Sequence, residues 1–238
     1  MFFKTRSGLT AADGRFIAST LGSTPGDREE IIGTLGDPEA ITPLLHDGRL
    51  FERSMTPPPV FLDISPQLFF YVFIYRALDR RRLADDDVVD YVADVCVEFR
   101  STAPLLHFAE ARGGFYYVTD LLNFMDELDG AHRHMLRKYI GNITLFLTGF
   151  FPAYFVARTD RKGAPSIGFY EGIAREQYSS AAHDPDARDE NTAGLLVTLS
   201  ERFGDVRGAL NDLSVEHGLV GGPGAAGRVS GPGGPSAG

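Results

Sequence analysis

The stretch from Tyr139 to Val156, YIGNITLFLTGFFPAYFV, carries no formal charge over 18 consecutive residues. No other part of the chain stays apolar for so long, so we expect this stretch at the centre of the core. Its large apolar side chains recur every three or four residues, a spacing that gathers them on one helical face: Ile140, Ile143, Leu147 and Phe150. The pattern predicts a central apolar helix over about residues 139–151.

The length of this stretch is near the lower limit for a membrane-spanning helix. Its interior argues against a span, because Asn142 is polar and Gly141 and Gly149 weaken a helix. Pro152 is expected to end or kink the helix. A buried helix of a soluble bundle is therefore the better interpretation, and we expect no membrane partner.

Asn142 is the unusual residue of the stretch, because its amide has two donors and an acceptor that need partners when buried. It either cross-links neighbouring helices or points into a pocket, and we favour the cross-link. If it lines a pocket, the candidate ligand-binding residues are Asn142 and Tyr139 together with Tyr71 and Tyr75. The last two belong to a predicted helix over residues 66–78 that is apolar almost all round, so that helix is either buried or shared with a partner.

Composition restricts the functional classes. The 238 residues are 43% hydrophobic and carry a net charge of -9, which argues against nucleic acid and anionic membrane surfaces as partners. The single cysteine, Cys96, excludes an intrachain disulfide and indicates a reducing compartment. Because the first residues also lack the apolar core of a signal peptide, we expect a cytoplasmic protein. The preference for Arg over Lys is typical of a GC-rich bacterial genome.

Helical periodicity covers most of the chain, and no segment has a convincing strand pattern. We predict a single all-α domain over 1–218, an irregular multi-helix bundle. It consists of a small N-terminal helical unit (1–55), a rigid proline spacer (56–59) and a main bundle (60–218). The Gly/Pro-rich tail, 219–238, is predicted to be disordered because it has too little apolar surface to bury.

Two charged runs follow the helix that contains Tyr71. Arg80–Arg82 at its end and Asp85–Asp87 at the start of the next helix both complement the helix dipole, so neither run requires a ligand. In the second of these helices an acidic row lies opposite a stripe of valines, and we expect it to be a solvated outer face: Asp87, Asp90, Asp94 and Glu98.

Motifs for catalysis or for metal binding are weak. His107 and Glu110 have the spacing of a ligand pair, but a di-metal bundle needs two Glu-x-x-His units in that order plus two further Glu, and none of these is present. A G-x-G-x-x-G match at residues 222–227 follows no strand and opens no helix, so it is a chance match. Cys96 joins an apolar stripe and is expected to be buried rather than nucleophilic. We therefore predict no catalytic residue, no cofactor and no metal site.

The preferred interpretation is a cytoplasmic bacterial interaction or regulatory protein without catalytic activity, which binds a protein partner or forms a homo-oligomer. The alternative is a helical bundle that binds an apolar or aromatic small molecule, either as a binding protein or as an enzyme. The apolar helix at 66–78 should help to separate the two, because bare apolar surface on it would favour a partner and a cavity beside it would favour a ligand.

Overall fold

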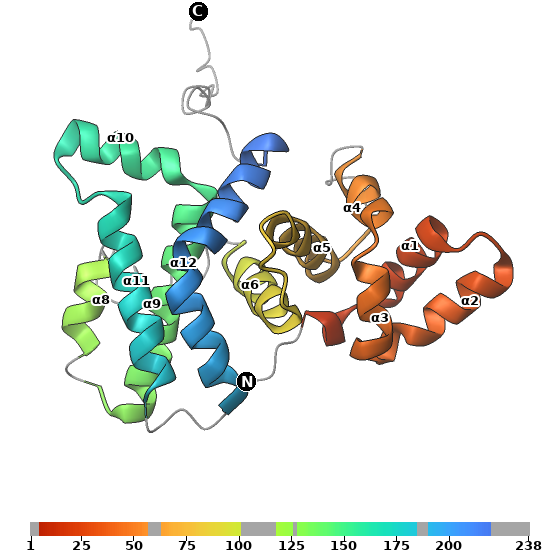
Figure 1. The fold of residues 1–238 in the computed structure, drawn as a ribbon, viewed down its shortest axis with the longest axis horizontal. Helices are drawn as coiled ribbons and strands as arrows, with labels where there is room; N and C mark the ends of the chain where they lie inside the picture. The colour runs from red at the N-terminus through yellow and green to blue at the C-terminus, as the bar shows by residue number, and fades with distance from the viewer. Residues whose placement is uncertain (1–4, 57–62, 101–117, 126–127, 185–189, 220–238) are drawn as a thin grey trace, which may run out of the picture.

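The computed structural model spans residues 1–238 and describes the ranges 5–56, 63–100, 118–125, 128–184 and 190–219 (Figure 1). Within these ranges the chain forms eleven α-helices and two short 3-10 helices and no strand, so the predicted all-α class is confirmed. Nearly all of the predicted proline spacer, and the predicted tail apart from Leu219, lie outside the described residues.

The N-terminal unit consists of six short elements that end at Met55. They are η1 (Arg6–Gly8), α1 (Ala11–Leu21), α2 (Pro25–Gly33), η2 (Thr34–Gly36), α3 (Pro38–Leu45) and α4 (Gly48–Met55). Local capping explains several starts: Thr10 and Asp13 form the capping box expected before α1, and Asp37 caps α3 ahead of a proline. Helix α4 was not predicted, because its sequence begins with Gly48, immediately after an expected stop.

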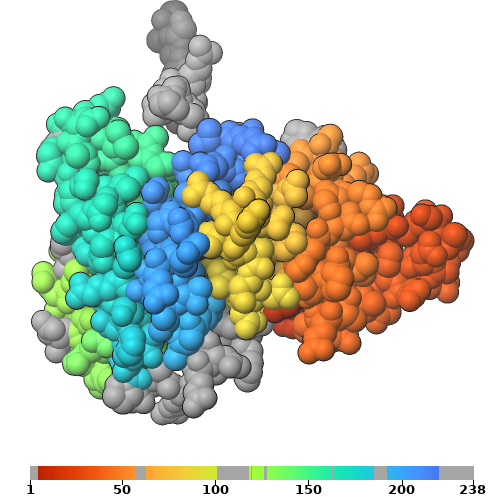
Figure 2. Space-filling model, viewed as in Figure 1, coloured from red at the N-terminus to blue at the C-terminus, as the bar shows by residue number. Residues whose placement is uncertain are grey.

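Seven helices build the main bundle within the described ranges. They are α5 (Pro66–Asp79), α6 (Asp86–Phe99), α8 (Val118–Met125), α9 (Gly130–Phe150), α10 (Pro152–Lys162), α11 (Ile167–Ala182) and α12 (Glu190–Glu216). Helices α8 to α11 occupy one end of the long axis, α1 to α3 occupy the other, and α5, α6 and α12 lie between them (Figure 1). In the space-filling view α1 and α2 form the tip of the molecule farthest from α10 (Figure 2).

Helix α9 is the predicted central helix, but it begins well before Tyr139. Asp129 caps its start by accepting a hydrogen bond from the backbone N–H of His132. The helix packs against α6, α8, α11 and α12. Gly141 and Gly149 leave room for the side chains of α11 and α12 that approach it closely.

The apolar stretch does not stay in the core to its end, which corrects the expectation from sequence. Pro152 starts a separate helix, α10, and the chain bends by 87° between α9 and α10. Beyond the bend Phe151, Tyr154 and Val156 are 45%, 55% and 55% exposed. No single helix in the described ranges is long and apolar enough to cross a membrane, although α9 and α10 taken together meet that criterion by length and composition.

Helix α5 is covered by the chain itself. Ser65 caps it with Pro66 at its first position, as predicted. Its buried side chains point in several directions around the helix: Leu68, Tyr71, Val72, Phe73, Ile74, Ala77 and Leu78. Little apolar surface on α5 therefore remains for a partner.

Candidate functional site

Arg6 and Asp90 form the polar centre of the contact between the N-terminal unit and the bundle. The backbone N–H of Arg6 donates to Oδ1 of Asp90 at 3.0 Å, and its Nε donates to Oδ2 at 3.2 Å. Asp90 is only 4% exposed. Burial raises the pKa of Asp90, and the hydrogen bonds from Arg6 oppose that rise.

Other members of the acidic row also contact the N-terminal unit. Thr5 donates its hydroxyl proton to Asp94, and the guanidinium of Arg6 lies 3.6 Å from a carboxylate oxygen of Asp87. Arg6 also donates to the hydroxyl of Thr42 on α3 at 2.9 Å. The prediction of a solvated outer face is therefore wrong for Asp90, which is buried, and for Asp94, which is partly buried, whereas Asp87 and Glu98 are exposed. The face receives η1, which the pattern within α6 alone could not indicate.

Tyr71 and Tyr75 lie beside the same contact and flank one histidine. The ring of His46 stacks on Tyr75 with centroids 3.7 Å apart, and its Nε2 lies 3.3 Å from the hydroxyl of Tyr71. Nε2 also lies 3.4 Å from Asp86. Burial lowers the pKa of His46 and raises that of Tyr71. These two candidate ligand-binding tyrosines therefore contact the protein's own N-terminal unit.

Asn142 joins three helices. Tyr91 on α6 and Tyr178 on α11 both donate their hydroxyl protons to Oδ1 of Asn142, at 2.7 and 2.9 Å. Burial raises the pKa of both phenols, so both stay protonated and able to donate. The favoured cross-link is confirmed, and the sequence had not identified either tyrosine as the partner.

Tyr139 lies one helical turn before Asn142 and packs elsewhere. Its ring lies 5.5 Å from that of Phe99, and burial raises the pKa of its hydroxyl to about 12. The structure therefore places the four candidate residues in two separate groups. Tyr71 and Tyr75 lie beside His46. Tyr139 and Asn142 belong to α9, and each contacts a different side chain of α6.

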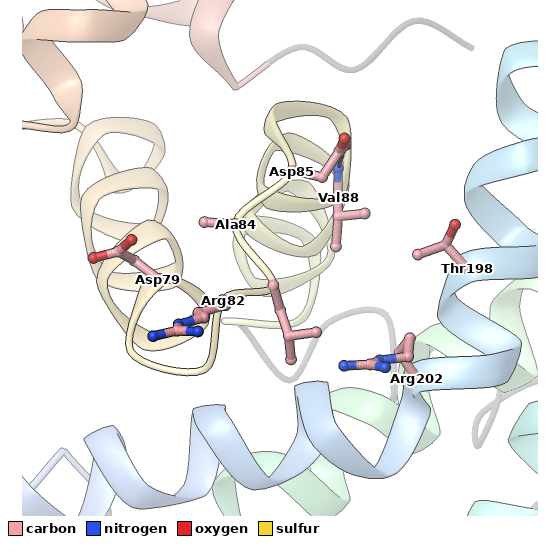
Figure 3. A pocket seen from close by; sticks show the side chains of 8 residues that line it. Asp79, Arg82, Ala84, Asp85, Val88, Thr198 and Arg202 are labelled. Atoms are coloured by element: carbon pink, nitrogen blue, oxygen red, sulfur yellow. Dashed lines mark hydrogen bonds between the residues drawn. The ribbon is translucent and has the colours of Figure 1, made fainter.

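An open pocket lies between the α5–α6 turn and α12 (Figure 3). Its volume is about 630 Å³, and none of the four candidate residues lines it. Two Asp and two Arg residues line it together with apolar and hydroxyl groups. Arg202 is paired with Asp205 at 3.1 Å. The opposite charges balance, so the lining favours no particular class of ligand.

Groups suited to metal binding or to nucleophilic chemistry are not gathered in the described ranges. There, no set of three or more His, Cys, Asp or Glu side chains could hold a metal ion. His107 and Glu110 lie outside the described residues. Cys96 is fully buried, and burial raises the pKa of its thiol, which disfavours the nucleophilic thiolate.

Helix α10 presents an aromatic and basic surface that the sequence did not reveal. Three side chains of the helix recur at steps of four and three residues and share one flank, and the exposed Phe151 directly precedes the helix: Tyr154, Arg158 and Arg161 follow Phe151 in this row. We call this row the α10 stripe. Arg158 donates to the hydroxyl of Tyr154 at 2.6 Å, and its guanidinium lies 5.4 Å from the centre of that ring.

Phe155 is the one buried side chain among those described on α10, and it packs against α11. Its ring lies 5.0 Å from that of Tyr170 on α11. Val156 and Phe169, at 55% and 44%, add exposed apolar surface on and beside α10. Helix α10 therefore packs against α11 through Phe155, and Tyr154 and Val156 remain exposed.

Comparison of the chain with protein-family models, with curated proteins and with solved structures gave no match.

Proposed function

We propose that this protein is a non-catalytic interaction or regulatory protein that binds a protein partner through the α10 stripe. The observation that carries the proposal is the exposure of Phe151 and Tyr154 in the stripe, with Val156 also exposed on the same helix. Single exposed apolar side chains are ordinary, whereas several on one element indicate a binding surface. Covering such surface is favourable by roughly 25 cal/mol per Å².

The chemistry of the stripe suits a protein interface. Tyr and Arg are enriched at such interfaces and often supply most of the binding energy. The hydrogen bond between Arg158 and Tyr154 already orders both side chains, so less conformational entropy is lost on binding.

The alternative function would place an apolar or aromatic small molecule among Asn142 and the candidate tyrosines. Asn142, Tyr71 and Tyr75 instead contact other protein side chains. These contacts support the interaction role over the ligand-binding one. The proposal includes the cytoplasm, where a free thiol such as that of Cys96 persists.

Site-specific photo-crosslinking tests the proposal. A benzophenone amino acid replaces Tyr154 in one variant and Met135, which is 58% exposed on α9, in a control variant. Each full-length variant is irradiated in extract of the cells that naturally produce the chain. We expect a defined protein adduct from position 154 that is absent from position 135 and is lost when Arg158→Glu is added. The same adducts from both positions, or none from position 154, would refute the proposal.

A further inference from the structure

We infer that the α10 stripe binds helix α2 of a second copy of this chain, in a head-to-tail contact. The inference rests on the proposed function, because it names the partner of the same stripe. It also predicts assembly beyond a dimer, since each copy has one stripe and one α2.

The charge of the stripe disfavours a symmetric contact with itself. By sequence, α10 carries Arg158, Arg161 and Lys162 against Asp160, a net charge of +2 in a chain whose net charge is -9. In a two-fold contact each stripe would meet its own copy, so the guanidinium groups would face like charges. The complementary surface must instead combine exposed apolar area with unpaired acidic groups.

Among the described residues three large apolar side chains are exposed away from the region of α10: Ile32, Met135 and Val215. Met135 has basic neighbours in sequence, Arg137 and Lys138, so it lacks the acidic groups that would complement the stripe. Val215 has acidic neighbours, but Asp212 and Glu216 are already paired with Arg81 and Arg80.

Ile32 meets both requirements. It is 43% exposed on α2, close to Glu29 and Glu30, which are exposed and have no ion-pair partner within the described ranges. None of the nine residues of α2 is buried. Helices in proteins owe most of their stability to tertiary packing, so α2 is a helix that would gain from a partner.

The positions of α2 and α10 determine the form of the assembly. They lie at opposite ends of the long axis and cannot meet within one copy (Figure 1, Figure 2). A contact between different surfaces of two copies is heterologous, and it continues as a chain unless the rotation closes it into a ring. The stripe of one copy would then be covered by α2 of the next.

Sedimentation velocity of the full chain tests this inference through complementation. Tyr154→Glu disables the stripe, Ile32→Lys disables α2, and Val215→Lys is a control at an exposed apolar residue. We expect the wild type and the control to form species larger than a dimer as concentration rises. Each of the other two variants should associate at least tenfold more weakly.

An equimolar mixture of Tyr154→Glu and Ile32→Lys retains one intact stripe and one intact α2, so it should form a 1:1 heterodimer and nothing larger. This result would also show that both variants are folded. A wild type that stays monomeric, a variant that still assembles alone, or a mixture without a heterodimer would overturn the inference. If the crosslink at position 154 yields a different protein while the wild type is monomeric, the proposed function survives and only the second copy is refuted.

Discussion

The ring of Tyr178 occupies the space that a side chain on Gly141 would need. A Cβ added to Gly141 would lie 2.5 Å from Cε1 of Tyr178, far inside van der Waals contact. Tyr178 is fully buried and bonded to Asn142, so its ring has little freedom to move aside. The approach of α9 to α11 therefore depends on a glycine in the middle of a helix.

We predict that Gly141→Ala destabilises the protein by about 1–3 kcal/mol, because overpacking forces the buried ring or the helices to shift. Gly172 on α11 is the control, since a Cβ there meets nothing within 4 Å. Gly172→Ala should be neutral or should stabilise by about 0.5–1 kcal/mol. Urea unfolding monitored by circular dichroism measures both. Equal effects at the two positions would show that the contact with Tyr178 is unimportant.

Removal of the shared acceptor should also destabilise the fold. Asn142→Ala removes the buried acceptor that the hydroxyls of Tyr91 and Tyr178 share, at a cost of about 1–3 kcal/mol. If Tyr91→Phe and Tyr178→Phe are added, the triple variant should lose less than the sum of the three single losses, because both donors are then removed together with their acceptor. Strict additivity in urea unfolding would argue against the cross-link as the source of the effect.

Arg6→Ala should weaken the attachment of the N-terminal unit. It leaves the carboxylate of Asp90 buried with only the backbone N–H at position 6, and we expect a loss of about 3 kcal/mol. Arg49→Ala, which breaks an exposed ion pair with Asp47, should change stability far less. Adding Asp90→Leu to Arg6→Ala should recover part of the loss, since no buried charge remains. If Arg6→Ala lowers the unfolding free energy no more than Arg49→Ala does, the contact between Arg6 and Asp90 does not stabilise the attachment of the N-terminal unit.

His46 should make stability depend on pH. Burial lowers its folded pKa below the usual 6.5, so folding favours the neutral ring. This contribution is present above pH 6.5 and is lost as pH falls from 6.5 through the folded pKa. Asp86 and Asp79 oppose the shift, and Arg6 adds to it, while Tyr71 and Tyr75 flank the ring.

Unfolding free energies measured between pH 8 and pH 5.5 should therefore fall more steeply for the wild type than for His46→Gln. The raised pKa of Asp90 acts in the opposite sense, because protonation of Asp90 favours the folded state. Its effect on stability falls in the pH range between 3.8, the usual pKa, and the raised folded pKa. Identical slopes for the wild type and His46→Gln would refute the role of His46.

Local signals in the sequence were reliable where the structure depends on neighbouring residues. The capping pair Thr10 and Asp13 and the Ser65–Pro66 start were predicted and are present, because capping involves residues within one turn. The contact between Arg6 and Asp90 joins positions 84 apart. No pattern within α6 indicates which segment will cover its acidic face, so that face was misjudged.

The candidate site was predictable only in part, for a similar reason. Asn142 was identifiable because a lone amide in an apolar run needs partners, but its partners come from two distant helices. The α10 stripe and the exposed Val156 beside it could not be identified from the sequence, because Phe151, Tyr154 and Val156 continue the composition of the core. Only the bend at Pro152 takes them out of it, and the direction of a bend is set by tertiary packing.

A local cap formed by Gly218 and Leu219 ends α12. Gly218 adopts φ +62°, its N–H donates to the carbonyl of Val215, and the N–H of Leu219 donates to that of Ser214 at 3.0 Å. This is a Schellman arrangement, and Leu219 packs against the core. The predicted tail thus begins one residue too early, at a residue that contributes to packing.

Truncation after Leu219 should therefore leave the melting temperature nearly unchanged, since residues 220–238 have a composition that cannot offset their ordering entropy. Truncation after His217 removes the capping hydrogen bonds and the partly buried leucine, at a cost of about 1 kcal/mol, which corresponds to roughly 2–4 °C in a chain of this size. Gly218→Ala in the full chain should also lower stability by about 1 kcal/mol, because a left-handed backbone disfavours a Cβ. Thermal melts of the four proteins separate these effects. A large loss on truncation after Leu219 would mean that residues beyond it also pack, and equal melting temperatures for both truncations would mean that the cap contributes nothing.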